Sequence, residues 1–249
     1  MTLSIRDLTV GYGGTDVLTD VAFDAPRGRL TALIGANGAG KSTLLKAIAG
    51  IARTTGAVML DGAPFDARED VAYMPQDTSA ASGLTMLETV MLGRLRNLGW
   101  STPRSVIEDA AALLDRFGLA ALAERPLHSV SGGQRQLAFL AQALLRRPRA
   151  LLLDEPTAAL DLRHQLLVLE AVRADAESRD VVVIAAMHDL GLVAQFADHI
   201  VCISGGSVVG ADAPEALLTD ELIAATYGVA AEVARTERGL RITPIAALP

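Results

Sequence analysis

The chain has 249 residues, of which 51% are apolar and 20% are charged, so it is long enough for one large α/β domain or for a domain with an inserted subdomain, and a disordered chain is excluded. The formal net charge of −7, spread without long like-charge blocks, creates no field that attracts nucleic acid or an anionic membrane, so no nucleic-acid partner is expected. The single cysteine, Cys202, excludes an internal disulfide and indicates a reducing compartment, and its apolar neighbours predict a buried structural thiol.

The first residues predict neither a targeting segment nor a membrane anchor. Residues 1–7 carry no basic leader, and no window of the chain approaches the roughly 20 apolar residues of a membrane-spanning helix. We therefore expect a soluble chain whose role at a membrane, if it has one, comes through a partner.

Strands and turns are predicted in the first third of the chain. Strands are expected at 3–10, 21–25 and 30–34. The glycine-rich stretch 35–40 follows the third strand directly, and residues 41–49 have helical composition up to Gly50. The pattern predicts a strand–loop–helix unit.

The middle of the chain is predicted to be largely helical. After a hairpin turn at Asp61-Gly62 and a short strand at 71–74, helical spacing dominates from Thr85 to Arg147. Two helices are predicted by apolar residues at helical spacing, one through Met86, Val90, Leu95 and Leu98 and one through Val106, Ala110, Leu113, Leu114 and Phe117. We expect an all-helical subdomain inserted at about 77–147.

Strands and helices alternate in the last third. Strands are expected at 150–153, 181–186 and 200–203, with a helix at 162–176, and this alternation predicts a parallel sheet. A hairpin turn is expected at Gly205-Gly206 and a short helix from Pro214. Residues 229–249 form either a small strand pair or a loose tail. The predicted division is one domain over 1–228 and a C-terminal tail over 229–249.

A phosphate-binding loop is predicted between the strand at 30–34 and the helix that follows. The run Gly35-Ala36-Asn37-Gly38-Ala39-Gly40-Lys41-Ser42, continued by Thr43, fits the pattern G-x-x-x-x-G-K-[ST]. Glycines let backbone N–H groups converge on phosphate oxygens, Lys41 can reach the β- and γ-phosphates, and Ser42 can ligate magnesium. The alternative is a glycine turn that precedes a lysine by chance. The loop predicts a nucleoside triphosphate and leaves its use open.

Two carboxylates end the predicted strand at 150–153. A strand terminus at the carboxyl edge of a parallel sheet places side chains at the phosphate crevice, where Asp154 could hold magnesium, directly or through water. Glu155 would then face the attacking water as a general base. The alternative is an ordinary strand end with a solvated Asp-Glu pair, which the nearby phosphate loop makes less favoured.

A third motif resembles a family signature. Val130-Ser131-Gly132-Gly133-Gln134, followed by a helical run, resembles the Leu-Ser-Gly-Gly-Gln signature of ABC ATPases, with valine in place of the leucine. Its serine hydroxyl and glycine amides at a helix N-terminus could form a second anion site. A helix cap of this composition is the alternative reading of Ser131, Gly132, Gly133 and Gln134.

Further residues match motifs of this family, and they occur along the chain in the same order as in the family. Tyr12 resembles the aromatic residue that stacks on adenine, Gln76 the glutamine that senses magnesium and the membrane partner, Asp161 the end of the D-loop, and His188 the switch histidine. Each match is weak alone, because a turn aromatic, a loop glutamine, a helix N-cap and a structural histidine fit the same residues. Their joint order, over roughly residues 3–226, carries the resemblance.

The resemblance implies a P-loop NTPase fold: a RecA-like core, an antiparallel β layer and the helical subdomain. It implies that ATP and Mg²⁺ bind, the metal at Ser42, Gln76 and Asp154, and that Glu155, His188 and Gln76 take part in hydrolysis. Two copies would pack head to tail around two ATP molecules. The implied partners are integral membrane permease subunits, received near Gln76 and the helical insert, and indirectly a substrate-binding protein. The implied location is the cytoplasmic face of the inner membrane.

The subgroup within the family is indicated by shorter motifs. Residues 161–165, 187–190 and 226–229, which read Asp-Leu-Arg-His-Gln, Met-His-Asp-Leu and Thr-Tyr-Gly-Val, resemble ATPases of importers for siderophores, haem or cobalamin. The same residues can form helix caps and faces, so importers of metal ions, molybdate or amino acids remain open. Two further alternatives are a non-transport ABC ATPase, disfavoured by the single cassette and the absence of heptads, and a module that binds ATP without hydrolysing it.

Overall fold

Two sheets lie at the centre of the computed structural model, which describes residues 2–77, 83–97, 102–237 and 239–248. The first sheet is antiparallel, in the order β2-β1-β4-β5. Its strands are β1 (Thr2–Tyr12), β2 (Thr15–Pro26), β4 (Thr55–Leu60) and β5 (Ala63–Pro64). The strand expected at 3–10 is confirmed, with Leu3, Ile5, Leu8 and Val10 buried, whereas the second strand begins six residues before the expected 21.

The second sheet is parallel except at one edge, in the order β10-β9-β3-β8-β7-β6. Its strands are β3 (Leu30–Ile34), β6 (Val71–Met74), β7 (Ala150–Asp154), β8 (Val182–Ala186), β9 (His199–Ser204) and β10 (Ser207–Asp212). The predicted parallel sheet is therefore confirmed. Since the strands run the same way, the carboxyl ends of β3, β7 and β8 meet at one edge.

Both faces of the parallel sheet are buried, which explains its continuous apolar strands. Leu33, Leu152 and Ile184 belong to a core shared with the antiparallel sheet and with helix α1 (Lys41–Ile48). Their sequence neighbours face the opposite core, which includes residues of α5 (Gly132–Leu145), α6 (Leu162–Arg179) and α7 (Leu190–Phe196). Cys202 is fully buried on β9, as predicted.

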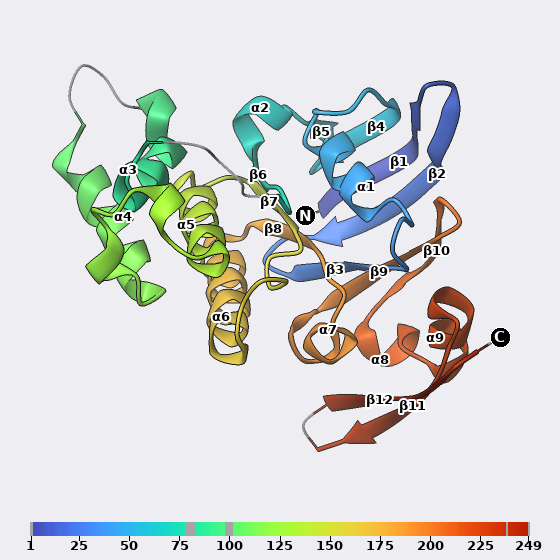
Figure 1. Ribbon diagram of the computed structural model, residues 1–249. Coiled ribbons are helices and arrows are strands. Elements are labelled where there is room, and N and C mark those ends of the chain that lie inside the picture. Colours follow the sequence, from blue (N-terminus) through green and yellow to red (C-terminus); the bar gives the residue numbers. More distant parts are fainter. Residues whose placement is uncertain (1, 78–82, 98–101, 238, 249) are drawn as a thin grey trace.

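A helical segment lies to one side of the sheets in Figure 1 and is drawn at the left. It contains α3 (Met86–Met91), the 3₁₀ helix η1 (Leu92–Asn97), α4 (Arg104–Arg116), η2 (Ala120–Leu122), η3 (Leu127–Ser129) and α5; a short helix α2 (Ala67–Asp70) precedes β6. The single helix predicted through Met86 and Leu98 is wrong, because the α-helix ends at Met91 and Arg94 leaves helical geometry. Gly93 packs against the α5 backbone, where an added Cβ would lie 2.2 Å from the Gln142 carbonyl oxygen. Leu98 lies outside the described residues.

The C-terminal residues form the strand pair that was one of two expectations for them. After α8 (Pro214–Leu217) and α9 (Asp220–Tyr227), strands β11 (Val229–Thr236) and β12 (Gly239–Ala247) pair antiparallel, so a loose tail is wrong for 229–247. Within the described ranges, no helix combines the length and the apolar character needed to cross a bilayer.

Candidate active site

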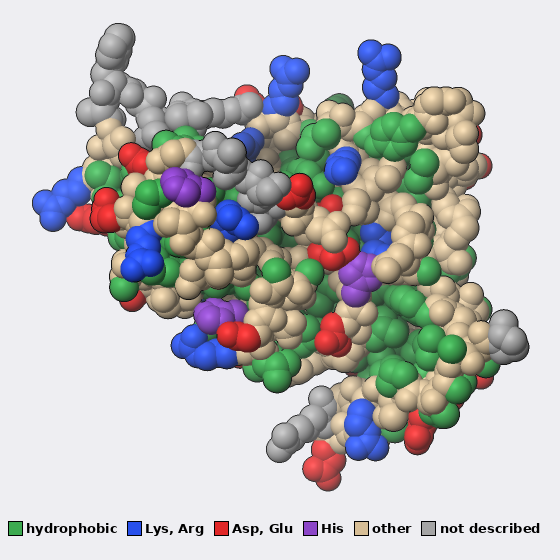
Figure 2. Space-filling view, viewed as in Figure 1, with side chains coloured by type: hydrophobic (Ala, Val, Ile, Leu, Met, Phe, Trp, Pro, Cys, Tyr) green, Lys and Arg blue, Asp and Glu red, His purple; other side chains and the backbone are tan. Residues whose placement is uncertain are grey.

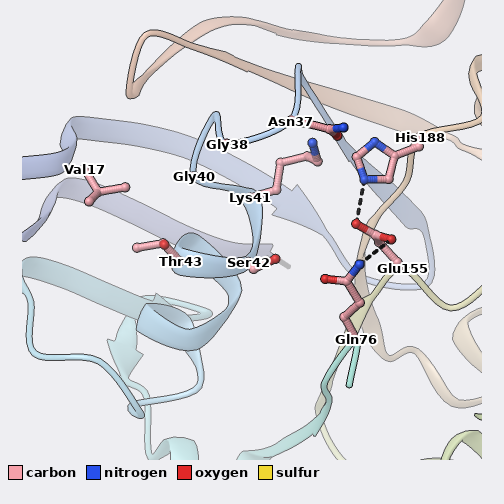
Figure 3. Close-up of a pocket in the computed structure, with 10 residues that line it drawn as sticks. All are labelled: Val17, Asn37, Gly38, Gly40, Lys41, Ser42, Thr43, Gln76, Glu155 and His188. Carbon is pink, nitrogen blue, oxygen red and sulfur yellow. Dashed lines mark hydrogen bonds and ion pairs between the residues drawn. The ribbon is translucent and has the colours of Figure 1, made fainter. Parts of the chain in front are cut away.

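A cleft of about 610 Å³ opens where the carboxyl edge of the parallel sheet meets the start of α1. Its lining residues come from five parts of the chain and are shown in Figure 3: Val17, Asn37, Gly38, Gly40, Lys41, Ser42, Thr43, Gln76, Glu155 and His188. In Figure 2, basic, acidic and histidine side chains meet near the middle of the face shown. We call this space the central cleft.

The predicted phosphate loop connects β3 to α1 and forms one wall of the central cleft. Gly35 has φ +148°, and an added Cβ would lie 2.2 Å from the carbonyl oxygen of Ile203 on β9. Only glycine fits there without displacing the neighbouring strand. The loop delivers the chain to the N-terminus of α1, where unpaired N–H groups favour an anion.

Lys41 carries the one ammonium group among the cleft-lining residues. Its Nζ donates to the Gly35 carbonyl oxygen at 2.6 Å and to the Ala36 carbonyl oxygen at 3.0 Å. Burial lowers the pKa of Lys41, while the carboxylates of Glu155 and Asp154 oppose that shift. The ammonium is therefore held by neutral carbonyl oxygens in a poorly solvated place, where a phosphate oxygen would be a stronger partner.

Asp154 ends β7 and is only 2% exposed. Its Oδ1 accepts a hydrogen bond from the Ser42 hydroxyl at 2.9 Å, and its Oδ2 accepts one from the Tyr73 hydroxyl at 3.2 Å. Burial raises the pKa of Asp154, and the two hydrogen bonds oppose that shift. Burial and the neighbouring Asp154 charge also raise the pKa of Tyr73.

The Ser42–Asp154 pair fits a magnesium ion. Magnesium prefers oxygen ligands, and here a hydroxyl and a buried carboxylate lie within hydrogen-bond distance of each other beside the phosphate loop. A carboxylate whose pKa is raised by desolvation gains stability from a nearby cation. Gln76, the third predicted metal residue, lines the same cleft and donates its hydrogen bond to Glu155.

Glu155 is held by contacts from three other segments of the chain. Its Oε2 accepts from Gln76 Nε2 at 2.8 Å, its Oε1 lies 2.6 Å from His188 Nε2, and its backbone oxygen accepts from Gln136 Nε2 at 2.8 Å. Figure 3 shows the Gln76 and His188 side chains reaching the carboxylate from opposite sides. The backbone of Glu155 has φ +53°, an uncommon conformation for a residue with a side chain. Such strain persists where surrounding contacts determine it, and it clusters at active sites.

The arrangement at Glu155 suits general-base chemistry. An ionised carboxylate only accepts hydrogen bonds, so the close contact requires His188 to carry its proton on Nε2. The imidazole and the Gln76 amide thus fix the orientation of the carboxylate at the cleft wall. The structure brings together all three residues predicted to take part in hydrolysis.

The signature residues do not line the central cleft. Ser131 and Gln134 form a capping box at the start of α5: Gln134 N donates to Ser131 Oγ at 3.2 Å, and Ser131 N donates to Gln134 Oε1 at 3.0 Å. The alternative reading of these residues as a helix cap is thus realised. The Ser131 hydroxyl accepts the bond from Gln134 N, and its own proton can still donate to another group. The backbone N–H groups of Gly132 and Gly133, in the first turn of α5, have no acceptor within their helix.

Asp161 and Tyr12 also lie outside the cleft lining. Asp161 caps α6 by accepting from His164 N at 2.9 Å, and the D-loop before it touches the signature, since a Cβ on Gly133 would meet the Ala159 carbonyl oxygen at 2.8 Å. Tyr12 ends β1 with 53% of its surface exposed. Among the described residues, then, the phosphate loop gathers with Asp154, Glu155, Gln76 and His188, while the signature and D-loop form a separate group.

Four residues near the cleft were not predicted as site residues. Val17 lines the cleft, Tyr73 bonds Asp154, Gln136 bonds the Glu155 backbone, and Tyr227 accepts a hydrogen bond from Gly35 N at 3.0 Å. The strand that carries Tyr73 was predicted, but its pairing with the strand that ends in Asp154 was not, so the contact of Tyr73 with Asp154 appears only in the structure. Gln136 and Tyr227 reach the site across long stretches of sequence, and the motif at 226–229 that contains Tyr227 indicated a subgroup but not a contact with the phosphate loop.

Comparison with known proteins gives consistent similarities. A family model described as ABC transporter matches residues 18–158. The chain is 35% identical over 248 residues to the iron(3+)-hydroxamate import ATP-binding protein FhuC of Bacillus subtilis, covering 95% of this chain and 91% of that protein. It is 39% identical over 247 residues to the hemin import ATP-binding protein HmuV of Roseobacter denitrificans, covering 94% and 93%.

A relative of greater length is also similar. The cobalamin import ATP-binding protein BtuD of Halobacterium salinarum is 41% identical over 237 residues, which are 91% of this chain and 59% of that protein. The chain thus spans less than two thirds of that relative.

Solved structures show the same fold. A structure described as a metal-chelate type ABC transporter in an inward-facing conformation superposes with a TM-score of 0.83 at 28% identity, covering 98% of both chains. An ATP-binding cassette dimer bound to ADP and Pi in a post-hydrolysis state has a TM-score of 0.76 at 25% identity, covering 85% of this chain and 98% of that one. The predicted P-loop NTPase fold is confirmed.

Proposed function

The chain belongs to the ABC transporter family, and on that premise we propose that it is the ATP-hydrolysing subunit of an importer. The observation that carries the proposal is Glu155, whose carboxylate is held between Gln76 and His188 at the wall of a cleft that also contains the phosphate loop. Binding alone would not require this arrangement, because a phosphate-binding loop needs no oriented base. The proposal includes the domain division at 1–228 and the insert at about 77–147.

In the proposed reaction, this chain's residues bind ATP and activate water. Backbone N–H groups of residues 38–43 and the Lys41 ammonium bind the β- and γ-phosphates, replacing the carbonyl oxygens that Lys41 now contacts. Glu155 accepts a proton from a water whose oxygen attacks the γ-phosphorus, and the bond to the bridging oxygen breaks to give ADP and phosphate. His188 and Gln76 orient the carboxylate.

Ser42 and Asp154 are the proposed magnesium ligands, with Gln76 near the same site. Magnesium, when bound, would neutralise charge that develops on the β- and γ-phosphate oxygens. Tyr73 holds the second oxygen of Asp154 and so fixes the direction of the carboxylate.

We propose that a second copy of the chain completes the site. The signature group of Ser131 to Gln134 does not line its own cleft, yet it retains a hydroxyl proton and free helix amides that suit a phosphate. Next to it, Leu162 follows the D-loop with 79% of its surface exposed. An exposed apolar residue beside an unused anion site suits an interface between copies. Each signature would then cover the ATP on the partner's loop.

A permease would dock beside β6. A groove of about 230 Å³ there is lined by Tyr73, Pro75, Leu92, Phe139 and their neighbours on α5. The groove lies next to Gln76. Tyr73 donates a hydrogen bond to Asp154, and Gln76 donates one to Glu155, so a helix seated in the groove would lie close to the partners of both carboxylates. This arrangement would place the chain at the cytoplasmic face of the inner membrane, with a substrate-binding protein as an indirect partner.

The proposed cargo is an iron chelate such as a ferric siderophore or haem. The similarity to FhuC and HmuV over nearly the whole of each protein supports this class, and the similarity to BtuD keeps cobalamin within it. The cargo is read by partner proteins, so this part of the proposal depends on the subgroup alone.

Phosphate release by the purified chain tests the proposed reaction. We expect release that requires both ATP and magnesium, and its loss in Lys41→Ala, because no second ammonium lines the central cleft in the described residues. Binding of ATP without release would indicate the non-hydrolysing alternative. Cells that lack the chain should lose uptake of one labelled iron chelate while retaining uptake of molybdate and amino acids.

A further inference from the structure

The last turn of α9 contacts the first residue of the phosphate loop. The backbone N–H of Gly35 donates a hydrogen bond to the Tyr227 hydroxyl oxygen at 3.0 Å, although 192 residues separate the two in sequence. Tyr227 is the final residue of α9, and the following Gly228 takes a left-handed conformation with φ +64°. The chain then turns into β11, at the right of Figure 1.

A neighbouring contact fixes the end of α9 against the parallel sheet. Thr226 is buried, and its Oγ1 lies 3.6 Å from the sulfur of the fully buried Cys202 on β9. Cys202 pairs in register with Ile34, the residue just before Gly35 on β3. Two successive residues of α9 therefore contact β9 and the first loop residue after the neighbouring β3, which sets the position of the Tyr227 hydroxyl relative to Gly35.

The Tyr227 hydroxyl is protonated in this contact. Burial raises the pKa of Tyr227 to about 12, so the side chain keeps its proton at neutral pH. Its oxygen accepts the Gly35 N–H as a neutral hydroxyl. The other polar group of Gly35, its carbonyl oxygen, is bonded by Lys41.

In the proposed ATPase, ATP binding breaks one of these two hydrogen bonds to Gly35 and leaves the other in place. Lys41 must leave the Gly35 carbonyl oxygen to bind phosphate, whereas Tyr227 bonds the Gly35 N–H and is not among the residues that line the central cleft. The hydroxyl can therefore hold the loop before and after ATP arrives.

We propose that Tyr227 is a positioning residue of the phosphate loop, whose hydroxyl fixes the Gly35 N–H and so keeps the loop in its ATP-binding conformation. This inference rests on the proposed function. It makes ATP affinity depend on a C-terminal segment that contributes no residue to the cleft lining.

Tyr227→Phe removes the hydroxyl and keeps the ring. The Gly35 N–H then loses its acceptor, and a smaller fraction of molecules holds the binding-competent loop, which weakens apparent affinity by that fraction. We expect the KM and the Kd for ATP to rise about tenfold, with kcat within about twofold of the wild type, because Glu155, Gln76 and His188 keep their contacts. Hydrogen exchange of the Gly35 amide should become faster.

Thr219→Ala is the matched control at the other end of the same helix. It removes the N-cap bond from Leu222 N to Thr219 Oγ1, 3.1 Å long, so it loosens α9 without touching Gly35. We expect a lower melting temperature with unchanged KM and Gly35 exchange.

Two results would overturn the inference: an unchanged KM and Gly35 exchange rate in Tyr227→Phe, or an equal rise of KM in Thr219→Ala, which would mean that α9 stability alone is measured. Failure of the wild-type protein to bind ATP is a separate result, and it would reject the proposed function.

Discussion

The central cleft and the signature end of α5 differ in how complete they are within one chain. In the cleft, residues from the phosphate loop, the end of β7 and two loops already contact one another: Ser42 bonds Asp154, and Gln76 and His188 bond Glu155. At the start of α5, the side chains of Ser131 and Gln134 hydrogen-bond to each other's backbone N–H, and in the described part of the chain neither reaches the central cleft. One region is assembled by folding, and the other is a capped helix end.

The two regions have different geometric requirements. The catalytic groups need fixed mutual geometry, because a base misplaced by a fraction of its hydrogen-bond length loses its effect. Under the proposed function, the signature needs only to present a hydroxyl and amides to a phosphate held by a second copy. We therefore expect the central cleft to bind ATP in a monomer and the signature to act only in a dimer.

The largest expected effect is in the cleft, at Glu155→Gln. The substitution is nearly isosteric and leaves Lys41, Ser42 and Asp154 in place, so ATP binding survives while the attacking water loses its acceptor. We expect hydrolysis at least about a hundredfold slower, with a long-lived ATP-bound dimer. Single-turnover phosphate release and light scattering measure the two effects. Near-normal turnover would move the catalytic role away from Glu155.

Ser131→Arg is expected to change ATP-driven dimerisation much more than ATP binding by the monomer. The arginine side chain occupies the space in front of the α5 N-terminus, so it blocks the approach of a partner's ATP and leaves the central cleft of its own chain untouched. ATP affinity of the monomer should stay within about twofold, while ATP-driven dimerisation should need at least about tenfold more protein. Size-exclusion chromatography with ATP under non-hydrolysing conditions separates these outcomes; weakened monomer binding with normal dimerisation would contradict the division between the two regions.

The smallest expected effect concerns the stability of the cleft without ligand. Since burial raises the pKa of Asp154 above its unfolded value, the ionised carboxylate destabilises the folded state as the pH rises through that folded pKa. Asp154→Asn removes this charge and should raise the metal-free melting temperature by roughly 2 °C at neutral pH.

The pH dependence of that gain checks its cause. The gap between variant and wild type should narrow as the pH falls toward the pKa of Asp154, because protonation then relieves the wild type as well. A gap that stays constant with pH would show that the gain does not come from the charge of Asp154, and a lower melting temperature in the variant would show that the hydrogen bonds from Ser42 and Tyr73 outweigh desolvation.

Much of the fold could be predicted from local patterns. The strands at 30–34 and 71–74 were predicted with their observed bounds, because short apolar runs between turn residues are typical of buried parallel strands. The phosphate loop was also recognisable from a local pattern, because its glycines and Lys41 lie within eight residues. The helix through Met86 and Leu98 was not predicted correctly, because spacing alone shows neither the end of the α-helix at Met91 nor the close approach of Gly93 to α5.

The candidate site was predictable where motifs carry it and hidden where tertiary contacts do. Asp154 and Glu155 follow from a strand that ends at the sheet edge. The bond from Gln136 to the Glu155 backbone and the bond from Gly35 to Tyr227 depend on how α5 and α9 pack on the sheet. Gln136 occupies an ordinary helix position, and the motif that contains Tyr227 gives no indication of its partner, so both contacts appear only in three dimensions.

The most direct test of the account mixes Lys41→Ala with Ser131→Arg, two variants that each disable one region. In a head-to-tail dimer of the two, one site combines both defects and the other combines the intact phosphate loop of Ser131→Arg with the intact signature of Lys41→Ala. The account predicts that neither variant alone retains labelled ATP in a dimer under non-hydrolysing conditions, and that the mixture does. A mixture that forms no ATP-containing dimer, or a Ser131→Arg protein that forms one by itself, would contradict a site shared between two copies.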